Sequence, residues 1–260
     1  MQQDGKSERV AVVTGGANGI GAEVGRRLAV AGYLVIIADR DRAAAETFAS
    51  ELKAAGHRAE AQFVDVGEAA SVTRAFDEVE RRHGRCDVLV NCAGIARVFP
   101  FLEFPLGDFV ATMNVNVTGT LLCSQHAGRL MARNGWGRIV NIASVAGMRA
   151  VGTGRTAYGT SKGAVIALTR QMAVELAAHG ITANAVSPGP VDTPMTRVLH
   201  SDKFRKEYTD AIPMARYGTT GEVANAVMYF VGDEAGYTTG VVLAVDGGFL
   251  ASGAREGDGS

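Results

Sequence analysis

A tyrosine and a lysine four positions apart, Tyr158 and Lys162, are the residues of this sequence best suited to proton transfer. They begin a long stretch of helical character, and residues four apart lie on one face of a helix. A phenol with a pKa of ~10 is a weak base at neutral pH. An ammonium ~4 Å away contributes ~4 kcal/mol at an effective dielectric constant of ~20, enough to bring that pKa toward neutrality. The pair therefore predicts a general acid/base, although the same spacing also occurs on ordinary exposed helices.

A glycine-rich turn follows the first strand candidate and precedes a helical stretch. It comprises Thr14, Gly15, Gly16, Ala17, Asn18, Gly19, Ile20 and Gly21. Glycine permits positive φ angles and a close approach of the backbone to phosphates. The N-terminus of the following helix adds free N–H groups and partial positive charge. The spacing is TGxxxGxG, because Val24 stands where the third glycine of GxGxxG would fall. A purely structural turn is the alternative, but the position in the first strand–helix unit favours a dinucleotide site.

Asp39 ends the second strand candidate. A carboxylate at that position accepts hydrogen bonds from the adenosine ribose hydroxyls and repels a 2′-phosphate. The alternatives are a helix N-cap or a plain surface charge. Arg40 follows directly and could hold a 2′-phosphate, but Asn18 in the glycine-rich turn adds no second cation. The sequence therefore predicts NAD as cofactor, with NADP as the less favoured choice.

The elements that must position these residues alternate along the chain. Strand candidates, which we interpret as nearly all apolar, cover residues 10–14, 33–39, 59–64, 88–91, 138–143, 182–187 and 241–245. Helix candidates cover residues 42–55, 69–83, 109–133, 157–179 and 221–231. Apolar strands are expected where helices cover both faces of a sheet. The pattern predicts an α/β protein with a Rossmann-type, doubly wound parallel sheet of about seven strands and helices on both faces.

No linker or internal repeat divides this pattern, so we expect one domain over residues 1–251. The segment 190–218 breaks the alternation, because four prolines, Pro188 included, lie from Pro188 to Gly218 around an amphipathic piece near Met195–Tyr208. Ligands of open α/β sheets bind beyond the carboxyl ends of the strands, so we interpret this segment as a lid over the substrate. The polar, glycine-rich tail 252–260 is predicted to be disordered.

Composition excludes several classes of function. With 47% hydrophobic and 20% charged residues among 260, the chain has the profile of a globular protein with a sizeable core. A net charge of −1 provides no general attraction for nucleic acid or anionic membranes. No apolar run approaches the ~18 residues of a membrane span, and the N-terminus lacks the apolar stretch of a signal peptide, so we expect a cytoplasmic protein. Cys86, Cys92 and Cys123 lack metal-site spacing and are interpreted as reduced thiols, so no metal is expected.

Several motifs occur in a fixed order at the predicted strand–helix junctions. They are the glycine-rich turn, the run Asn91 to Gly94 (NCAG), Ser144, the pair Tyr158 and Lys162, and the dipeptide Pro188-Gly189. With this set, the chain resembles the short-chain dehydrogenase/reductase family, roughly from Arg9 to Phe249 and including the closing VDGG. The resemblance implies an NAD(P)-dependent enzyme that interconverts a secondary alcohol and a ketone. It also implies a homotetramer built through the long helices at 109–133 and 157–179 and the C-terminal segment.

The resemblance further implies a role for individual residues. Tyr158 matches the catalytic acid/base, Lys162 the lysine that lowers its pKa and holds the nicotinamide ribose, and Ser144 the serine that hydrogen-bonds the substrate oxygen. Asn116 matches the asparagine that anchors a water leading to the lysine; Asn114 is a near neighbour, but the Val-Thr-Gly that follows favours Asn116. The implied cofactor contacts are Gly15, Asn18, Gly19, Ile20, Gly21, Asp39, Arg40, Asp65, Val66, Asn91, Ala93, Gly94, Tyr158, Lys162, Pro188, Gly189, Val191 and Thr193.

Two departures from the family pattern concern the site. Cys92 stands where the family usually has asparagine, which we expect to alter packing rather than chemistry. The segment between Ser144 and Tyr158 is slightly long, which we expect to widen the substrate pocket. Candidate pocket segments are residues 95–101, 145–155 and 195–204; their apolar members include Val98, Phe99, Met148, Val151, Met195 and Leu199, and their arginines are Arg97, Arg149 and Arg155. These arginines could clamp an anionic substrate such as a hydroxy acid, or could form a solvated rim.

Two other functions are compatible with the motifs. One is an NADPH-dependent ketoreductase of the 3-oxoacyl type acting on carrier-bound acyl groups, against which Asp39 argues. The other is a protein that binds NAD without catalysing a reaction, against which the complete set of Asn116, Ser144, Tyr158 and Lys162 argues.

Overall fold

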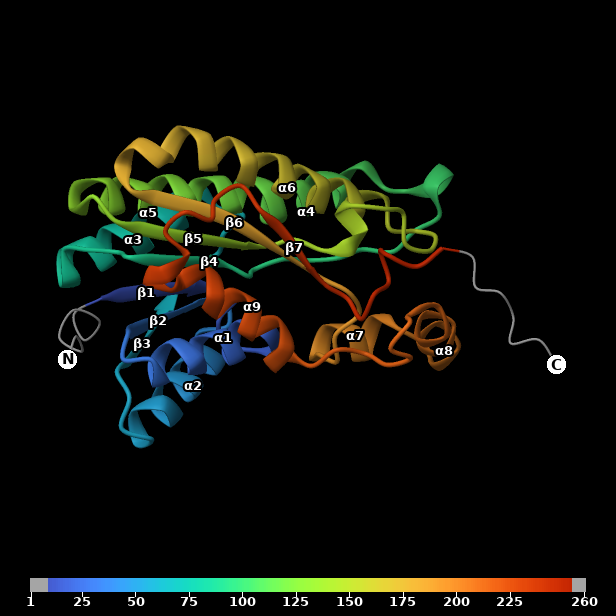
Figure 1. Ribbon diagram of the computed structural model, residues 1–260, viewed down its shortest axis with the longest axis horizontal. Coiled ribbons are helices and arrows are strands. Elements are labelled where there is room, and N and C mark those ends of the chain that lie inside the picture. The colour runs from blue at the N-terminus through green and yellow to red at the C-terminus, as the bar shows by residue number, and fades with distance from the viewer. Residues whose placement is uncertain (1–8, 254–260) are drawn as a thin grey trace.

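Seven parallel strands form one sheet in a computed structural model that describes residues 9–253 (Figure 1). Their order across the sheet is β3-β2-β1-β4-β5-β6-β7. The strands are β1 (Val10–Thr14), β2 (Leu34–Asp39), β3 (Ala59–Phe63), β4 (Val88–Asn91), β5 (Gly137–Ile142), β6 (Ile181–Pro188) and β7 (Val242–Val245). The chain builds outward from β1 to β3, returns to the centre at β4 and builds outward again to β7. This order confirms the predicted doubly wound sheet.

Helices cover both faces of the sheet. They are α1 (Gly19–Val30), α2 (Arg42–Ala54), α3 (Ala69–His83), α4 (Leu106–Met113), α5 (Gly119–Asn134), α6 (Thr156–Leu176), α7 (Pro194–Leu199), α8 (Asp202–Ala211) and α9 (Thr220–Val231). Figure 1 shows α1, α2 and α9 on one face and α3, α5 and α6 on the other. Within residues 9–253, none of these helices combines the length and the apolar character required to cross a bilayer.

Local sequence explains where several helices begin and end. The Asp41 carboxylate accepts the Ala44 N–H at 3.0 Å and so caps α2. At the start of α9, the Thr219 hydroxyl and the Glu222 carboxylate form a reciprocal capping box. Helix α3 ends at Gly84, whose φ of 67° lies in the left-handed region that favours glycine. These signals set the lengths of the helices that return the chain to the sheet.

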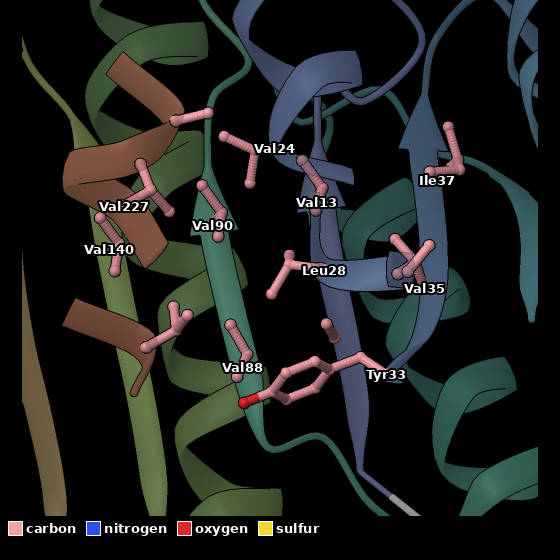
Figure 2. Close-up of a cluster of buried hydrophobic side chains, with 14 of the residues drawn as sticks. Val13, Val24, Leu28, Tyr33, Val35, Ile37, Val88, Val90, Val140 and Val227 are labelled. Carbon is pink, nitrogen blue, oxygen red and sulfur yellow. The ribbon is translucent and has the colours of Figure 1, made fainter. Parts of the chain in front are cut away.

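The core divides into two layers because alternate residues of a strand point to opposite faces of the sheet. Val13, Val35 and Val90 face α1 and α9, where they pack with side chains such as Leu28 and Val227 (Figure 2). Their neighbours Val12, Ile36, Leu89 and Ile139 face α3 and α5 instead. Continuous apolar runs are therefore required in the central strands, since both of their faces are buried.

The structure corrects two expectations about the elements. Strand β3 lies at the sheet edge, and its Glu60 and Gln62 are partly exposed, so not every strand is nearly all apolar. The helix expected over 109–133 is two helices, α4 and α5, joined by a π-helical turn at Asn114–Thr118. The amphipathic piece near Met195–Tyr208 consists of two helices, α7 and α8. Of the tail expected to be disordered, residues 254–260 lie outside the described part of the chain.

A buried carboxylate ties together the amino-terminal ends of two central strands. Asp87 directly precedes β4, and only 1% of it is exposed. Its Oδ2 accepts the Val10 N–H at the start of β1 at 2.8 Å. Two hydrogen bonds from the Arg85 guanidinium, both of 2.8 Å, neutralise its charge. Together with the ladder between β1 and β4, this carboxylate fixes the relative position of the two strands.

We expect Asp87→Ala to lower the free energy of unfolding by about 1–3 kcal/mol, because it leaves the buried Val10 N–H without an acceptor. Urea unfolding followed by circular dichroism measures this loss. Glu80→Ala is the control, since it removes an exposed ion pair with Arg133 and should cost less than about 1 kcal/mol. Equal losses for the two variants would contradict the role given to Asp87.

Candidate active site

A cavity of about 340 Å³ extends along the carboxyl ends of the strands. The loops that follow β1 to β6 form its walls, as expected for a ligand site in an open α/β sheet. All but two of the predicted cofactor residues line it. They are Gly15, Asn18, Gly19, Ile20, Asp39, Arg40, Asp65, Val66, Ala93, Gly94, Tyr158, Lys162, Pro188, Gly189, Val191 and Thr193. The two exceptions are Gly21 and Asn91.

The glycine-rich turn lies directly against the end of β4. Gly15 has a φ of 62°, and a Cβ added to it would come within 2.8 Å of the Ala93 backbone. The Thr14 hydroxyl accepts the N–H groups of Cys92 and Ala93 at 3.2 and 3.3 Å. Gly21 does not line the cavity, because it packs inside the turn, where an added Cβ would lie 2.1 Å from the Gly15 carbonyl oxygen. These contacts leave the N-terminus of α1 open to the cavity.

Asp39 places a negative charge at the end of β2, on the cavity wall. Its two carboxylate oxygens accept the N–H groups of Ala17 and Asp41, each at 3.0 Å. An ionised carboxylate has about four acceptor positions, so two bonds leave capacity for the hydroxyls of a ligand. The exposed Arg40 lies next to it on the same wall. Glycine backbone, a helix N-terminus and this carboxylate together fit the phosphates and ribose of a dinucleotide.

Asn91 is not among the residues that line the cavity, and its predicted contact with the cofactor stays a prediction. Its side chain is buried between β4, β5 and α5, where its amide nitrogen donates to Ser124 Oγ at 3.0 Å and to Asn141 Oδ1 at 2.8 Å. Asn141 in turn donates to the Thr169 hydroxyl at 2.8 Å, which extends the network to α6. The family resemblance implied a cofactor contact for Asn91, and its side chain points into a protein layer.

Cys92, the departure from the family pattern, lines the cavity. Burial raises the pKa of its thiol to about 11, so the group is a neutral thiol at physiological pH. That this position affects packing rather than chemistry stays a prediction.

Lys162 brings a buried ammonium to the same cavity. It lies in the second turn of α6, with 5% of its surface exposed. Its Nζ donates a hydrogen bond of 2.6 Å to the Ile142 carbonyl at the end of β5. The same Nζ lies 5.7 Å from the centroid of the Tyr158 ring, so the four-residue spacing does bring the two side chains together. Burial lowers the pKa of Lys162 to about 8.

The structure corrects the expected direction of the Tyr158 pKa. Enclosure of the phenol raises its pKa, while a hydrogen bond with Ser144 and the positive charge of Arg155 lower it less strongly. The sequence argument considered only attraction between the phenolate and the ammonium. Desolvation of the phenolate outweighs the Ser144 hydrogen bond and the Arg155 charge, and the Lys162 ammonium is bonded to the Ile142 carbonyl.

The Asn116 side chain is hydrogen-bonded to the backbone of one neighbour and to the side chain of another. It lies in the π-helical turn, where its side chain exchanges hydrogen bonds of 2.8 and 2.9 Å with the backbone of Ile95. Its amide also donates to Ser161 Oγ at 2.9 Å, and Ser161 donates to the Tyr158 carbonyl at 2.8 Å. A Cβ on Gly94 would lie 3.3 Å from Asn116 Oδ1 and 3.6 Å from Lys162 Nζ. Asn116 thus holds the start of α6 close to Gly94 without lining the cavity.

A second, smaller cavity of about 80 Å³ shares Ser144 and Tyr158 with the first. Its other lining residues are Ala96, Val145, Ala146, Val151, Arg155, Gly189, Pro190, Met195, Thr196, Leu199, His200, Phe204 and Tyr208. Among the residues singled out for a substrate pocket, Val98, Phe99, Met148, Arg97 and Arg149 are not part of this wall. Ser144 and Tyr158 therefore stand where a ligand of one cavity meets a ligand of the other.

Sequence reasoning missed several lining residues. Val64, Ile142 and Ala143 line the larger cavity at or just after the ends of β3 and β5, so the rule for strand ends would have found them. Val115 and Tyr208 carry no such signal, because only the packing of α4, α5 and α8 brings them to the walls.

Comparison with known proteins agrees with this geometry. A family model described as enoyl-(acyl carrier protein) reductase matches residues 15–250. The 3-oxoacyl-(acyl-carrier-protein) reductase FabG of Aquifex aeolicus is 39% identical over 93% of this chain and 97% of its own length. Cis-4-hydroxycyclohexanecarboxylate dehydrogenase of Sinomonas cyclohexanicum is 41% identical over 94% and 98%. The crystal structure of a gluconate 5-dehydrogenase from Burkholderia cenocepacia, in complex with NADP and tartrate, matches with a TM-score of 0.90 and 35% identity over 94% and 96% of the chains.

The lowered pKa of Lys162 predicts a stability that depends on pH. The unfolded chain titrates this lysine at ~10.4, against about 8 in the folded protein, so between these values the unfolded state binds more protons. The free energy of unfolding should therefore rise, by about 2–3 kcal/mol relative to Lys162→Met, as the pH increases across this interval. Urea unfolding at a series of pH values measures the difference. The exposed Lys53→Met variant controls for loss of a lysine, and curves for wild type and Lys162→Met that stay parallel would contradict the prediction.

Proposed function

This chain belongs to the short-chain dehydrogenase/reductase family, and we propose that it exchanges hydride between NAD and a secondary alcohol with Tyr158 as the acid/base. Oxidoreductase chemistry between alcohol and carbonyl groups is what membership of this family establishes. The proposal for Tyr158 is supported chiefly by one observation. Tyr158 and Ser144 stand on the wall common to the two cavities, with the Lys162 ammonium beside the tyrosine ring.

Each proposed catalytic group has a task that its surroundings suit. Ser144 and Tyr158 hydrogen-bond the oxygen that is alcohol or carbonyl. The raised pKa keeps Tyr158 protonated at neutral pH, so it can donate a proton to a carbonyl oxygen that is being reduced. In the oxidation direction Tyr158 accepts the alcohol proton, and the charges of Lys162 and Arg155 stabilise the phenolate. The oxidised nicotinamide, when bound, supplies the hydride acceptor and a further positive charge. Asn116 is a positioning residue that holds the start of α6.

The preference for NAD over NADP is supported by the Asp39 carboxylate on the cavity wall. Its charge would lie beside a 2′-phosphate, and repulsion between the two disfavours NADP. NADP is the alternative, because Arg40 lies on the same wall and the gluconate 5-dehydrogenase relative was solved with NADP. We place more weight on Asp39, whose position is fixed by two backbone hydrogen bonds, than on the exposed Arg40.

A second candidate function is reduction of carrier-bound 3-oxoacyl groups with NADPH. It is favoured by the 39% identity to the FabG protein of Aquifex aeolicus. Asp39 opposes NADPH, and the small volume of the second cavity, about 80 Å³, favours a compact substrate.

We also propose that the segment 190–218 acts as a lid. Its residues Met195 and Thr196 line both cavities, so an outward movement of α7 would open both at once.

A homotetramer is proposed because large apolar side chains are exposed on α4, α6 and the C-terminal segment, among them Leu106, Val174 and Tyr237. A cytoplasmic location is proposed because Cys86, Cys92 and Cys123 are all free thiols, which suits a reducing compartment.

Tyr158→Phe should abolish turnover while leaving NADH affinity within about threefold, because it removes one hydroxyl and keeps the ring that packs in the cavity. Absorbance of NADH during a screen of secondary alcohols measures turnover, and fluorescence titration measures NADH binding. Tyr229→Phe, which removes an exposed hydroxyl far along α9, is the matched control and should keep full activity. Turnover retained by Tyr158→Phe would refute the assignment.

Asp39→Ser should move the ratio of kcat/KM for NAD over NADP toward NADP by about tenfold to hundredfold. The reason is that hydrogen bonds to a charged group contribute ~1.5–3 kcal/mol, and the repulsion of the 2′-phosphate disappears with them. Asp41→Ser is the control, since Asp41 caps α2 outside the cavity and serine also caps helices. A ratio unchanged in Asp39→Ser, or changed equally in Asp41→Ser, would count against Asp39 as the discriminating residue.

A further inference from the structure

We propose that Arg155 binds a carboxylate of the substrate, so that the enzyme acts on compact hydroxy acids or the corresponding oxo acids. This inference rests on the proposed function, because it assigns the substrate class of the same site.

Arg155 is placed to meet a substrate that also reaches Tyr158. It occupies the N-cap of α6, three residues before Tyr158, and both residues line the small cavity. Its carbonyl accepts the Gly159 N–H at 2.8 Å, which fixes its backbone to the first turn of the helix. Its guanidinium carbon lies 5.4 Å from the centroid of the Phe204 ring. An arginine held over an aromatic ring has its planar fork oriented before a ligand arrives.

The small cavity contains a positive charge without a counter-ion. No aspartate or glutamate is among its lining residues, and within residues 9–253 no carboxylate forms an ion pair with Arg155. The Arg155 charge acts across the cavity, where it lowers the pKa of Tyr158 and of Tyr208 against the larger effect of burial. His200 adds no charge, because burial, and then Arg155 and Arg205, lower its pKa to about 4.

One acidic group of the lid, Asp192, is already paired. The Asp192 carboxylate oxygens lie 3.1 Å from Arg197 Nη2 and 3.6 Å from Arg205 Nη2. These two guanidinium groups compensate its charge outside the cavity. Arg149 donates to the Phe249 carbonyl at 3.4 Å, and Arg97 forms an ion pair of 3.3 Å with Asp108. Of the three arginines that the sequence offered as an anion clamp, Arg155 is the one that lines the cavity.

The surroundings of Arg155 suit a carboxylate with a compact apolar body. A guanidinium binds a carboxylate through two parallel hydrogen bonds, and such charge-assisted bonds are stronger than neutral ones. Val151, Leu199 and Phe204 contribute apolar walls, which limit competition from water and strengthen the attraction. The volume of about 80 Å³ restricts the body between carboxylate and reacting carbon to a short chain or a small ring.

The kinetic test compares short hydroxy acids with their primary amides, which have the same shape without the charge. Wild-type enzyme should prefer the acid by about tenfold or more in kcat/KM. Arg155→Gln should lose about tenfold to hundredfold on acids, mainly through KM, and change little on amides. Arg155→Lys should recover part of the loss, and Arg97→Gln is the matched control. Equal losses on acids and amides in Arg155→Gln, or a wild-type preference for amides, would overturn the proposal.

A binding measurement separates failure of this inference from failure of the proposed function. Isothermal titration of the NADH-loaded protein with cyclohexanecarboxylate should show binding that weakens about tenfold or more in Arg155→Gln and persists in Arg97→Gln. Cyclohexanecarboxamide should bind wild type and Arg155→Gln alike. If the carboxylate does not bind, or binds with an affinity that does not depend on Arg155, the inference is contradicted even if the enzyme oxidises alcohols. If no alcohol is turned over but carboxylate binding depends on Arg155, only the proposed function is contradicted.

Discussion

The hydrogen bond from the Lys162 ammonium to the Ile142 carbonyl is the contact on which the site depends. Burying a charge is costly unless polar groups replace the lost water, and this carbonyl at the end of β5 provides such a group. The bond also fixes α6 against the sheet, so the helix and the strand ends keep one relative position. Tyr158 and Ser144 are placed by the same two elements, since one lies on α6 and the other directly follows β5. The electrostatics of the site and its geometry therefore have a common origin.

The two cavities differ in what builds them. Most walls of the larger one are turns at the ends of six strands, held by contacts such as those of Thr14 and Gly15 with the end of β4. The smaller one is walled largely by the loop before α6 and by α7 and α8, which lie outside the sheet. Substitutions in these outer segments can change the shape of the smaller cavity without disturbing the turns. The reason is that the lining residues of the two cavities coincide at only a few positions.

Much of the fold could be predicted because the central strands must be apolar on both faces and the glycine turns must stand between strand and helix. The failures concern properties that arise only from packing. The side chain of Asn91, at the end of β4, is bonded to Ser124 and Asn141, an orientation that its place at a strand end does not indicate. The π-helical turn that carries Asn116 has no signal in the local sequence. The direction of the Tyr158 pKa was wrong because enclosure by distant segments cannot be judged from the spacing of two residues.

Helix α6 has a consequence for stereochemistry. The backbones of Arg155 and Tyr158 are fixed to one another by its first turn. Under the proposed carboxylate binding, a ketone would be held at two points, by its carboxylate and by its oxygen, and a half-turn about the line between them would exchange its prochiral faces. The outer walls of the small cavity on α7 and α8 would then set the handedness of the alcohol, because they decide on which side of that line the remaining substituent fits. Changes in the shape of these walls would therefore alter the enantiomeric preference while the two attachment points stayed the same.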